Sequence, residues 1–545
     1  MARLRSRSGP LPPEIPYSEF ALKGWRRFAD DTAIVDVLND RTVTFGQLEQ
    51  RVLRTAGRLQ RCGVGNQTHV QFVANNSVSA IVAFQAAVFC NATLSLFSPD
   101  ETLKYDEYRA QTEDAEVKFI ITDLANYEFV VHRFLADHSE TLVKVLLVDG
   151  APTRHQHPKA SFIDDEARLP DGGAFTPPTV NVRSDALLML YTSGSTGRPK
   201  GVLHSHYSYI SSMQNMRLLD FYHEGDRFLL TSSLTYVSGV IFHSGVLSHG
   251  ATLLLGSSQV ESDCLRYCKL YKPTVSILLE IPARNIVSSA AGNPNARKIL
   301  DTFRLLVVSG TVFPEALRTS IGNLFSNAKF MQLYGMTEML GPLVASDPAP
   351  SIGTVVGYSV PNATVRVINE HGSPVAVGES GEVEFTGIQK TLGYWKRSID
   401  SDVTADGFFR TGDIGVIDSD GQLTLLGRNK HFITCLDARV APLEIEEILL
   451  KHPAVAEAVV VGIPHPDYQQ APTALVVLRD KSASTASLSA ELIEFVASQS
   501  AEYKHLHGGV FFTDALEKTT SGKYARGAIT KTIQGLVDEC KACRL

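Results

Sequence analysis

Residues 187–202 read LLMLYTSGSTGRPKGV, and this stretch contains the most informative pattern in the chain. The apolar run 187–191 predicts a buried strand, which ends in glycines and hydroxyl side chains that close on Lys200. Glycine lets a ligand approach the backbone closely, and hydroxyls with a lysine suit an anionic group. The stretch therefore predicts a strand followed by a polyphosphate-binding loop.

The loop differs from a Walker A loop, because Lys200 comes three residues after Gly197 with Arg and Pro between them. A flexible Gly/Ser linker is the alternative interpretation. The preceding apolar run and the Pro-Lys-Gly ending count against a linker.

Composition narrows the class of protein. A chain of 545 residues is too long for one core and predicts two or three domains. A net charge of −7 without a long basic block argues against nucleic-acid binding. We also expect no membrane span, because no apolar run reaches the roughly 18 residues that one needs. Seven cysteines are too few for a disulfide framework in a chain this long and favour a reducing compartment.

Hydrophobic patterning predicts an α/β fold. Strand-like runs alternate with helical patterns over the first part of the chain, which indicates βαβ units and a largely parallel sheet. Thr44 and Gln47 match a capping box at the start of one helix. Short runs separated by Gly, Asp and Asn predict an antiparallel β subdomain over residues 355–426. The last 115 or so residues are enough for a small α+β core.

Three further segments carry candidate chemistry. The segment QLYGMTE at 332–338 offers an aromatic face, a hydroxyl and a carboxylate, which is a ligand that Mg²⁺ prefers. The segment FRTGD at 409–413 ends in a carboxylate that can accept both hydroxyls of a ribose, although Gly-Asp pairs also form simple Asx turns. The segment TSGK at 520–523 ends in a lysine, which alone would be an ordinary surface group.

Together these segments closely resemble the adenylate-forming superfamily, which includes acyl-CoA synthetases, 4-coumarate–CoA ligases, beetle luciferases and peptide-synthetase adenylation domains. The resemblance covers residues 20–530. It implies a large amino-terminal domain, residues 1–426, of layered α/β subdomains with a small β-barrel-like subdomain. A small, mobile α+β domain, residues 427–545, would follow, with a hinge near Lys430.

The resemblance also implies roles for individual residues. The catalytic residues would be Lys523, Thr337, Glu338 and Lys200, with Glu338 and Thr192 as metal ligands. The nucleotide would be bound by Thr192, Ser193, Gly194, Ser195, Thr196, Gly197, Gly310, Tyr334, Gly335, Asp413 and Arg428. The acid pocket would be lined by Tyr236, Val237, Gly239, Thr311 and Met339.

The function implied is ATP-dependent activation of a carboxylic acid to an acyl-AMP, followed by transfer to coenzyme A. ATP, Mg²⁺ and coenzyme A would be needed, and the acid would be of medium-chain, aryl or arylpropanoid type. The segment after the hinge departs from the family, because Thr434 stands where a lysine is common and Asp437 where a glycine is common.

Three alternatives stay open at this point. The first is a luciferase-like monooxygenase that acts on its own acyl-adenylate, and the second is adenylation without efficient transfer to coenzyme A. The third, an adenylate-binding protein without catalysis, is opposed by the intact lysine and acidic positions. The terminal Cys543-Arg544-Leu545 resembles a peroxisomal address read by an import receptor. We therefore expect a peroxisomal protein, or otherwise a cytoplasmic one.

Overall fold

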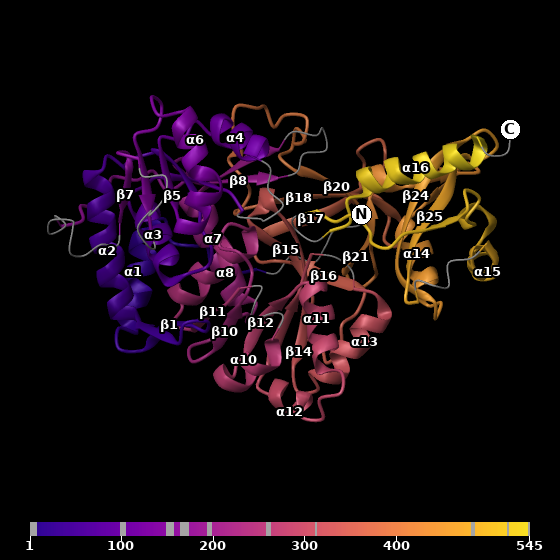
Figure 1. Cartoon of the computed structure of the whole chain (residues 1–545), viewed down its shortest axis with the longest axis horizontal. Helices are drawn as coiled ribbons and strands as arrows, with labels where there is room; N and C mark the ends of the chain where they lie inside the picture. Colours follow the sequence, from indigo (N-terminus) through magenta and orange to yellow (C-terminus); the bar gives the residue numbers. More distant parts are fainter. Residues whose placement is uncertain are drawn as a thin grey trace.

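The computed structural model describes residues 8–98, 105–148, 157–163, 174–192, 199–257, 263–310, 313–480, 486–519 and 523–542. Ser193–Gly197 of the phosphate loop, Thr311 and the terminal Cys543–Leu545 lie outside the described residues. Figure 1 shows a large body on one side and a small carboxyl-terminal domain, in orange and yellow, on the other. Both parts combine helices and strands, which confirms the predicted α/β class.

The first sheet is built around the strand that precedes the phosphate loop. Its eight strands are β3 (His69–Val73), β4 (Thr93–Leu96), β5 (Phe119–Thr122), β6 (Lys144–Leu147), β7 (Ala160–Phe162), β8 (Ala186–Thr192), β9 (Lys200–Ser205) and β19 (Gly393–Tyr394). Their order is β19-β9-β8-β4-β3-β5-β6-β7, and β8 to β7 run parallel. A parallel strand is covered on both faces, which explains why β8 reads as a continuous apolar run.

The second sheet contains a parallel part and an antiparallel part. Its strands are β1 (Thr32–Asp36), β2 (Arg41–Thr44), β10 (Arg227–Leu230), β11 (Thr252–Leu255), β12 (Val275–Leu278), β13 (Leu305–Val308), β14 (Lys329–Met336), β15 (Gly341–Ala345), β16 (Val355–Ser359), β17 (Ala363–Ile368), β18 (Ser380–Gly387), β20 (Phe409–Ile417) and β21 (Leu423–Arg428). Strands β1 and β10–β14 are parallel, whereas β15–β18, β20 and β21 pair antiparallel. The antiparallel strands therefore continue the parallel sheet beyond β14.

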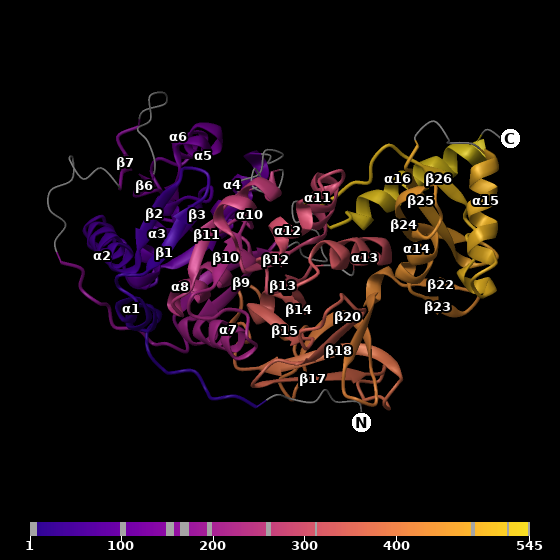
Figure 2. The same ribbon diagram turned by 90° about the horizontal axis from the view of Figure 1, so that it is seen from below.

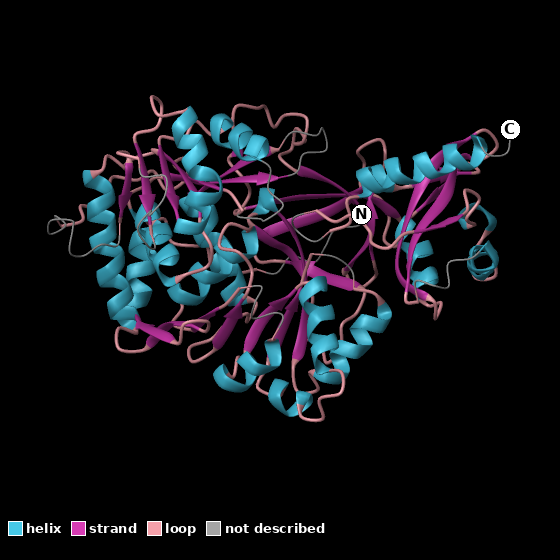
Figure 3. Cartoon of the chain, in the orientation of Figure 1, coloured by secondary structure: helices cyan, strands magenta, loops and turns pink. Residues whose placement is uncertain are grey.

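Helices flank the sheets of the large body (Figure 3). They are α1 (Tyr17–Arg27), α2 (Phe45–Arg61), α3 (Val78–Phe89), α4 (Tyr105–Asp114), α5 (Leu124–Asn126), α6 (His132–Asp137), α7 (His206–Leu218), α8 (Val237–Ser248), α10 (Cys264–Tyr271), α11 (Glu280–Ala290), α12 (Ala296–Leu300) and α13 (Glu315–Leu324), with a π-helical turn at Tyr127–Val131. The capping box predicted at α2 is confirmed, because Gln47 N donates to Thr44 Oγ1 and Thr44 N donates to Gln47 Oε1.

The carboxyl-terminal domain has a sheet and apolar cores of its own. Its elements are β22 (Ile433–Cys435), β23 (Ala438–Val440), β24 (Val455–His465), β25 (Gln469–Leu478), β26 (Val510–Phe512), α14 (Pro442–Leu450), α15 (Ala486–Ala497) and α16 (Arg526–Ala542). The Arg526 guanidinium of α16 lies 2.8 Å from the buried Glu446 carboxylate of α14. Figure 2 shows this domain beside α11 and α13 of the large body. Across the described part of the chain, no helix has the length and apolar character needed to cross a membrane.

The close crossing of α1 and α8 gives a stability prediction. A Cβ at Gly24 of α1 would lie 2.2 Å from the Ser248 carbonyl oxygen of α8. We expect Gly24→Ala to lower the free energy of unfolding by about 1–3 kcal/mol, because the helices must move apart. Gly322→Ala in α13 is the matched control, since nothing lies within 4 Å of a Cβ there. Thermal unfolding of both variants tests this, and an unchanged midpoint for Gly24→Ala would contradict it.

Candidate active site

A buried carboxylate, Asp413, lies at the centre of the candidate site. It sits on β20 opposite Arg428 of β21, and Arg428 Nε is 2.8 Å from Asp413 Oδ1. The Tyr334 hydroxyl, at the end of β14, donates to Asp413 Oδ2 at 2.5 Å. Burial raises the pKa of Asp413, while the Arg428 charge and the Tyr334 hydroxyl oppose the increase. Three predicted residues from distant parts of the sequence therefore meet at one point.

Lys523 reaches this centre from the small domain. Its side chain keeps contact with solvent. The surrounding protein nevertheless lowers the pKa of the Lys523 ammonium by desolvating it. The charge of Arg428 lowers this pKa further, and the charge of Asp413 opposes the change. The backbone N–H of Thr519 donates to the Lys523 carbonyl at 2.7 Å, which fixes the local backbone. The lysine is therefore close to the predicted nucleotide-binding residues and accessible to a ligand.

A second buried carboxylate, Glu338, lies in a short 3₁₀ helix, Thr337–Met339. Burial is the main reason that its pKa is raised. The Tyr394 hydroxyl donates to Glu338 Oε1 at 3.1 Å, and the Thr391 N–H donates to the Glu338 carbonyl at 2.8 Å. Both the backbone and the side chain of Glu338 are therefore held in place.

His204, the penultimate residue of β9, supports the same 3₁₀ helix. Its Nε2 lies 2.7 Å from the Thr337 carbonyl oxygen, which can only accept a hydrogen bond. Burial lowers the pKa of His204 to about 4, so the ring is neutral near pH 7 and carries its proton on Nε2. His204 thus fixes the backbone of Thr337 without adding charge to the site.

Lys200 is paired with a carboxylate that sequence reasoning missed. Its Nζ lies 3.2 Å from Asp402 Oδ2 and 4.5 Å from the centre of the Tyr394 ring. The side chains of Lys200 and Asp402 are 21% and 31% exposed. Because the Lys200 charge also opposes the rise in the Glu338 pKa, the two predicted catalytic residues share one electrostatic environment. An anion that binds Lys200 competes with Asp402.

The phosphate loop is anchored at both ends. Thr192 is the last residue of β8 and lies opposite Lys200 in the β8–β9 register. The residues between them that we expect to bind phosphate, Ser193–Gly197, lie outside the described part of the chain. The ends of the loop are therefore placed at the carboxyl end of a parallel strand, where α/β sheets bind ligands.

Two predicted glycines occupy positions that a side chain would disturb. Gly310 follows β13 with a φ of +95°, a conformation that suits glycine. A Cβ at Gly335 would lie 2.1 Å from the Gly341 carbonyl oxygen. The backbone directly after Tyr334 and at the end of β13 therefore requires residues without a side chain.

The residues predicted for the acid pocket fall into two groups. The first group lies at the start of α8: Tyr236 precedes the helix, and Val237 and Gly239 lie in its first turn. A Cβ at Gly239 would lie 1.9 Å from the Ser233 carbonyl oxygen, so this position requires glycine. Met339 is fully buried. Its methyl group faces β18, because a Cβ at Gly387 would lie 2.9 Å from Met339 Cε.

The segment predicted to be the hinge follows Arg428 directly. Lys430 is exposed within a 3₁₀ helix, Asn429–His431. The next hairpin, between β22 and β23, turns at Leu436 and Asp437, with φ values of +50° and +60°. Asp437 therefore adopts the left-handed backbone that favours glycine. Its carboxylate accepts from Gln469 Nε2 at 2.7 Å, which holds the turn against β25.

The functional contacts that sequence reasoning missed are those of His204, Thr391, Tyr394 and Asp402. None of them belongs to a short motif with a known spacing. The Gly393-Tyr394 strand pairs with β9, and this pairing of segments nearly 200 residues apart is what brings Tyr394 to Glu338 and Lys200.

Comparisons with known proteins identify relatives along most of the chain. A family model described as AMP-binding enzyme matches residues 22–395, and one described as AMP-binding enzyme C-terminal domain matches residues 444–523. A 4-coumarate–CoA ligase of Pinus taeda is 28% identical over 536 residues and 94% of each chain. The 4-coumarate–CoA ligase 5 of Oryza sativa subsp. japonica is 27% identical over 548 residues and 97% of each chain.

Solved structures share the fold. The anthranilate CoA ligase AuaEII in complex with anthranoyl-AMP aligns with a TM-score of 0.84 and 22% identity, over 97% of this chain and 99% of that one. ATP-bound MatB from Rhodopseudomonas palustris aligns with a TM-score of 0.82 and 23% identity, over 95% of this chain and 99% of that one.

The Lys200–Asp402 pair gives a prediction about ligand affinity. Asp402→Asn removes the charge that competes with a bound polyphosphate for Lys200, so we expect ATP to bind about two- to five-fold more tightly, the range for a partly exposed ion pair. Asp400→Asn is the control, because Asp400 lies in the same loop and bonds to Ser398. Calorimetric titration with ATP measures both, and weaker or unchanged binding in Asp402→Asn would contradict the competition.

Proposed function

The chain belongs to the AMP-binding enzyme family, and from this premise we propose that it is an AMP-forming acid–CoA ligase acting on an aryl or arylpropanoid-type carboxylic acid. The observation that carries the proposal is the meeting of Tyr334, Asp413 and Arg428 at one point, with Lys523 of the small domain near enough for its charge to act on Asp413 and Arg428. A site divided between two domains suits an enzyme that completes its catalytic centre by domain closure.

In the first step, a carboxylate oxygen of the acid attacks the α-phosphorus of ATP. The bond between that phosphorus and the bridging oxygen breaks, and pyrophosphate leaves with the electron pair. Two anions must approach each other, so the developing charge has to be stabilised. We assign this role to the Lys523 ammonium, to Lys200 and to donors of the phosphate loop, with the Thr337 hydroxyl on the α-phosphate.

The nucleoside would be bound by the Asp413 cluster. We propose that the ring of Tyr334 stacks on adenine and that Asp413 accepts hydrogen bonds from the ribose hydroxyls. Arg428 already holds one oxygen of Asp413 and Tyr334 the other. Because each carboxylate oxygen has a further lone pair, the ribose can bind without displacing either partner.

We propose that Glu338 holds Mg²⁺, with Thr192 as a second ligand. The donor set fits, because Mg²⁺ is usually bound by one or two carboxylates together with substrate phosphates. Tyr394 donates to Oε1 of Glu338, and we assign Oε2 to the metal. When bound, the metal neutralises charge on the leaving phosphates. The chain's own contribution is to hold Glu338 in place through Thr391, Tyr394 and His204.

In the second step, the coenzyme A sulfur attacks the acyl carbonyl carbon and AMP leaves. We propose that the small domain moves about Lys430 to present a different face for this step. The β22–β23 hairpin keeps a left-handed backbone at Asp437, which supports retention of the second step despite the loss of glycine. The names of the 4-coumarate–CoA ligase relatives support an arylpropanoid-type acid, and medium-chain acids are the alternative.

Pyrophosphate exchange tests the proposal directly. Benzoate-type, arylpropenoic and medium-chain acids are each supplied with ATP and labelled pyrophosphate, and AMP release is then measured with and without coenzyme A. We expect exchange with at least one aromatic acid and AMP release that depends on coenzyme A. Absence of pyrophosphate exchange with every acid of the panel would contradict the proposal. Oxygen uptake without thioester formation would favour a monooxygenase.

The role of Lys523 gives a mutational prediction. Lys523→Ala should lower the rate of pyrophosphate exchange by about 100- to 1,000-fold, because one preorganised charge-stabilising contact is lost. Lys531→Ala is the control, since Lys531 is an exposed lysine of α16 in the same domain. Equal exchange rates in the two variants would remove Lys523 from the mechanism.

The lowered pKa of Lys523 predicts at what pH kcat/KM for ATP begins to fall on the alkaline side. The ammonium must keep its proton to stabilise charge, and a lowered pKa means that the proton is lost earlier as the pH rises. We expect kcat/KM for ATP, which reports the free enzyme, to fall at a pH below the ordinary lysine value of 10.5. Lys523→Arg should lose this limb, since a guanidinium stays protonated. An unchanged alkaline limb in that variant would assign the titration to another group.

A further inference from the structure

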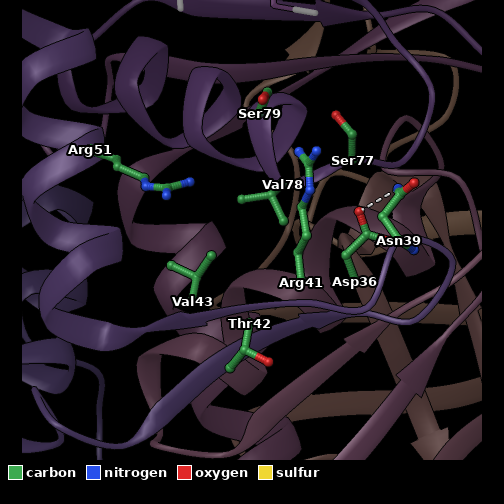
Figure 4. Close-up of a pocket in the computed structure, with 9 residues that line it drawn as sticks. All are labelled: Asp36, Asn39, Arg41, Thr42, Val43, Arg51, Ser77, Val78 and Ser79. Atoms are coloured by element: carbon green, nitrogen blue, oxygen red, sulfur yellow. Dashed lines mark hydrogen bonds between the residues drawn. The ribbon is translucent and has the colours of Figure 1, made fainter. Parts of the chain in front are cut away.

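A polar pocket lies apart from the candidate active site. Its cavity volume is about 480 Å³, and its lining comes from the β1–β2 hairpin, α2 and the start of α3. These residues are Asp36, Asn39, Arg41, Thr42, Val43, Arg51, Ser77, Val78 and Ser79 (Figure 4). The pocket adjoins the ends of β1 and β3, and β3 is separated from β8, which carries the phosphate loop, by β4.

Two arginines give the pocket its charge. Figure 4 shows the guanidinium groups of Arg41 and Arg51 on different walls, Arg41 extending from the β2 side towards Ser77 and Arg51 from α2. In the described part of the chain, no carboxylate forms an ion pair with either arginine. Both arginines are exposed, so their guanidinium groups are accessible to an anion that enters the pocket.

Among the described residues that line the pocket, Asp36 is the one carboxylate, and it is directed to its own loop. It accepts hydrogen bonds from the backbone N–H groups of Leu38 and Asn39 and from Asn39 Nδ2, the last at 2.8 Å. Asp36 therefore holds the β1–β2 turn in shape rather than neutralising the arginines. The pocket keeps a net positive charge.

The wall of the pocket at the start of α3 is held in place by hydrogen bonds. Asn76, next to Ser77, donates from Nδ2 to the carbonyls of Ser232 and Gly256 and accepts from Leu234 N–H, all at 2.9–3.0 Å. Ser77 itself caps α3 by accepting from Ala80 N–H. The positive end of the α3 dipole points at the same cavity. This wall is thus arranged before any ligand arrives, which lowers the cost of binding.

We propose that this pocket binds a phosphate-bearing small molecule, with Arg41 and Arg51 as its anchors. Arginine matches phosphate through paired N–H donors, and the cavity lies in the usual size range of small-ligand sites. Two molecules offer such phosphate groups: inorganic pyrophosphate, and coenzyme A at its phosphorylated end. The choice of these two ligands rests on the proposed function, whereas the pocket and its arginines are argued from the structure alone.

Arginine-specific modification with phenylglyoxal tests the site residue by residue. The full chain is treated with the reagent alone, with inorganic pyrophosphate or with coenzyme A, and each arginine is followed by peptide mass spectrometry. We expect a saturable, several-fold loss of modification at Arg41 and Arg51. Arg26 and Arg27, exposed arginines of α1 outside the pocket, should react at unchanged rates.

The two ligands separate the sources of phosphate. Equal protection by both means that the phosphate group alone is recognised, and protection at much lower concentration by coenzyme A identifies that substrate. Calorimetry supplies the second readout, in which Arg41→Gln/Arg51→Gln should lose a binding event, additional to that at the candidate active site, which Arg26→Gln/Arg27→Gln keeps. Protection by neither ligand, or equal binding by both double variants, would overturn the proposal. Neither readout uses catalytic activity, so failure here leaves the ligase proposal standing.

Discussion

The ion pair between Asp413 and Arg428 is the interaction on which the rest of the site depends. A buried carboxylate without a partner would become neutral, and a neutral Asp413 would accept ribose hydroxyls less well. Arg428 holds the charge from the neighbouring strand, and Tyr334 adds a hydrogen bond from β14. Arg428 is also the last residue before the 3₁₀ helix that contains Lys430. The candidate nucleotide-binding centre and the proposed hinge are therefore adjacent in the backbone.

Burial sets the protonation behaviour of the whole centre. It raises the pKa of Asp413 and Glu338 and lowers that of Lys523, so burial disfavours the charged form of each of these three groups. Opposite charges compensate: Lys200 and Arg428 oppose the shift at Glu338, and Asp413 opposes the shift at Lys523. A polyphosphate that enters this centre meets cations already positioned in a protein environment, which is the condition for strong electrostatic stabilisation.

Much of the fold and the outline of the site were predictable from local patterns. The apolar run before Thr192 is a parallel strand, Thr44 and Gln47 form their capping box, and Asp413 lies opposite Arg428 in an antiparallel pair. The partners of the catalytic residues were not predictable, because they come from distant segments. Asp402 lies 202 residues from Lys200, and His204 lies 133 residues from Thr337. No periodicity or turn signal connects such positions.

The sequence by itself determined which residues are candidates to bind phosphate, ribose and metal, because short-range backbone requirements, such as glycine at position 310 and a strand before the loop, are local. It also determined the family. The tertiary structure alone decided how these groups are charged and held: that Lys200 pairs with Asp402, that a neutral His204 fixes Thr337, and that Met339 faces Gly387. It also decided that Arg41 and Arg51 share a cavity. The physical reason is that burial depends on packing between segments that only the folded chain brings together. Burial in turn decides which side chains stay charged and where they point.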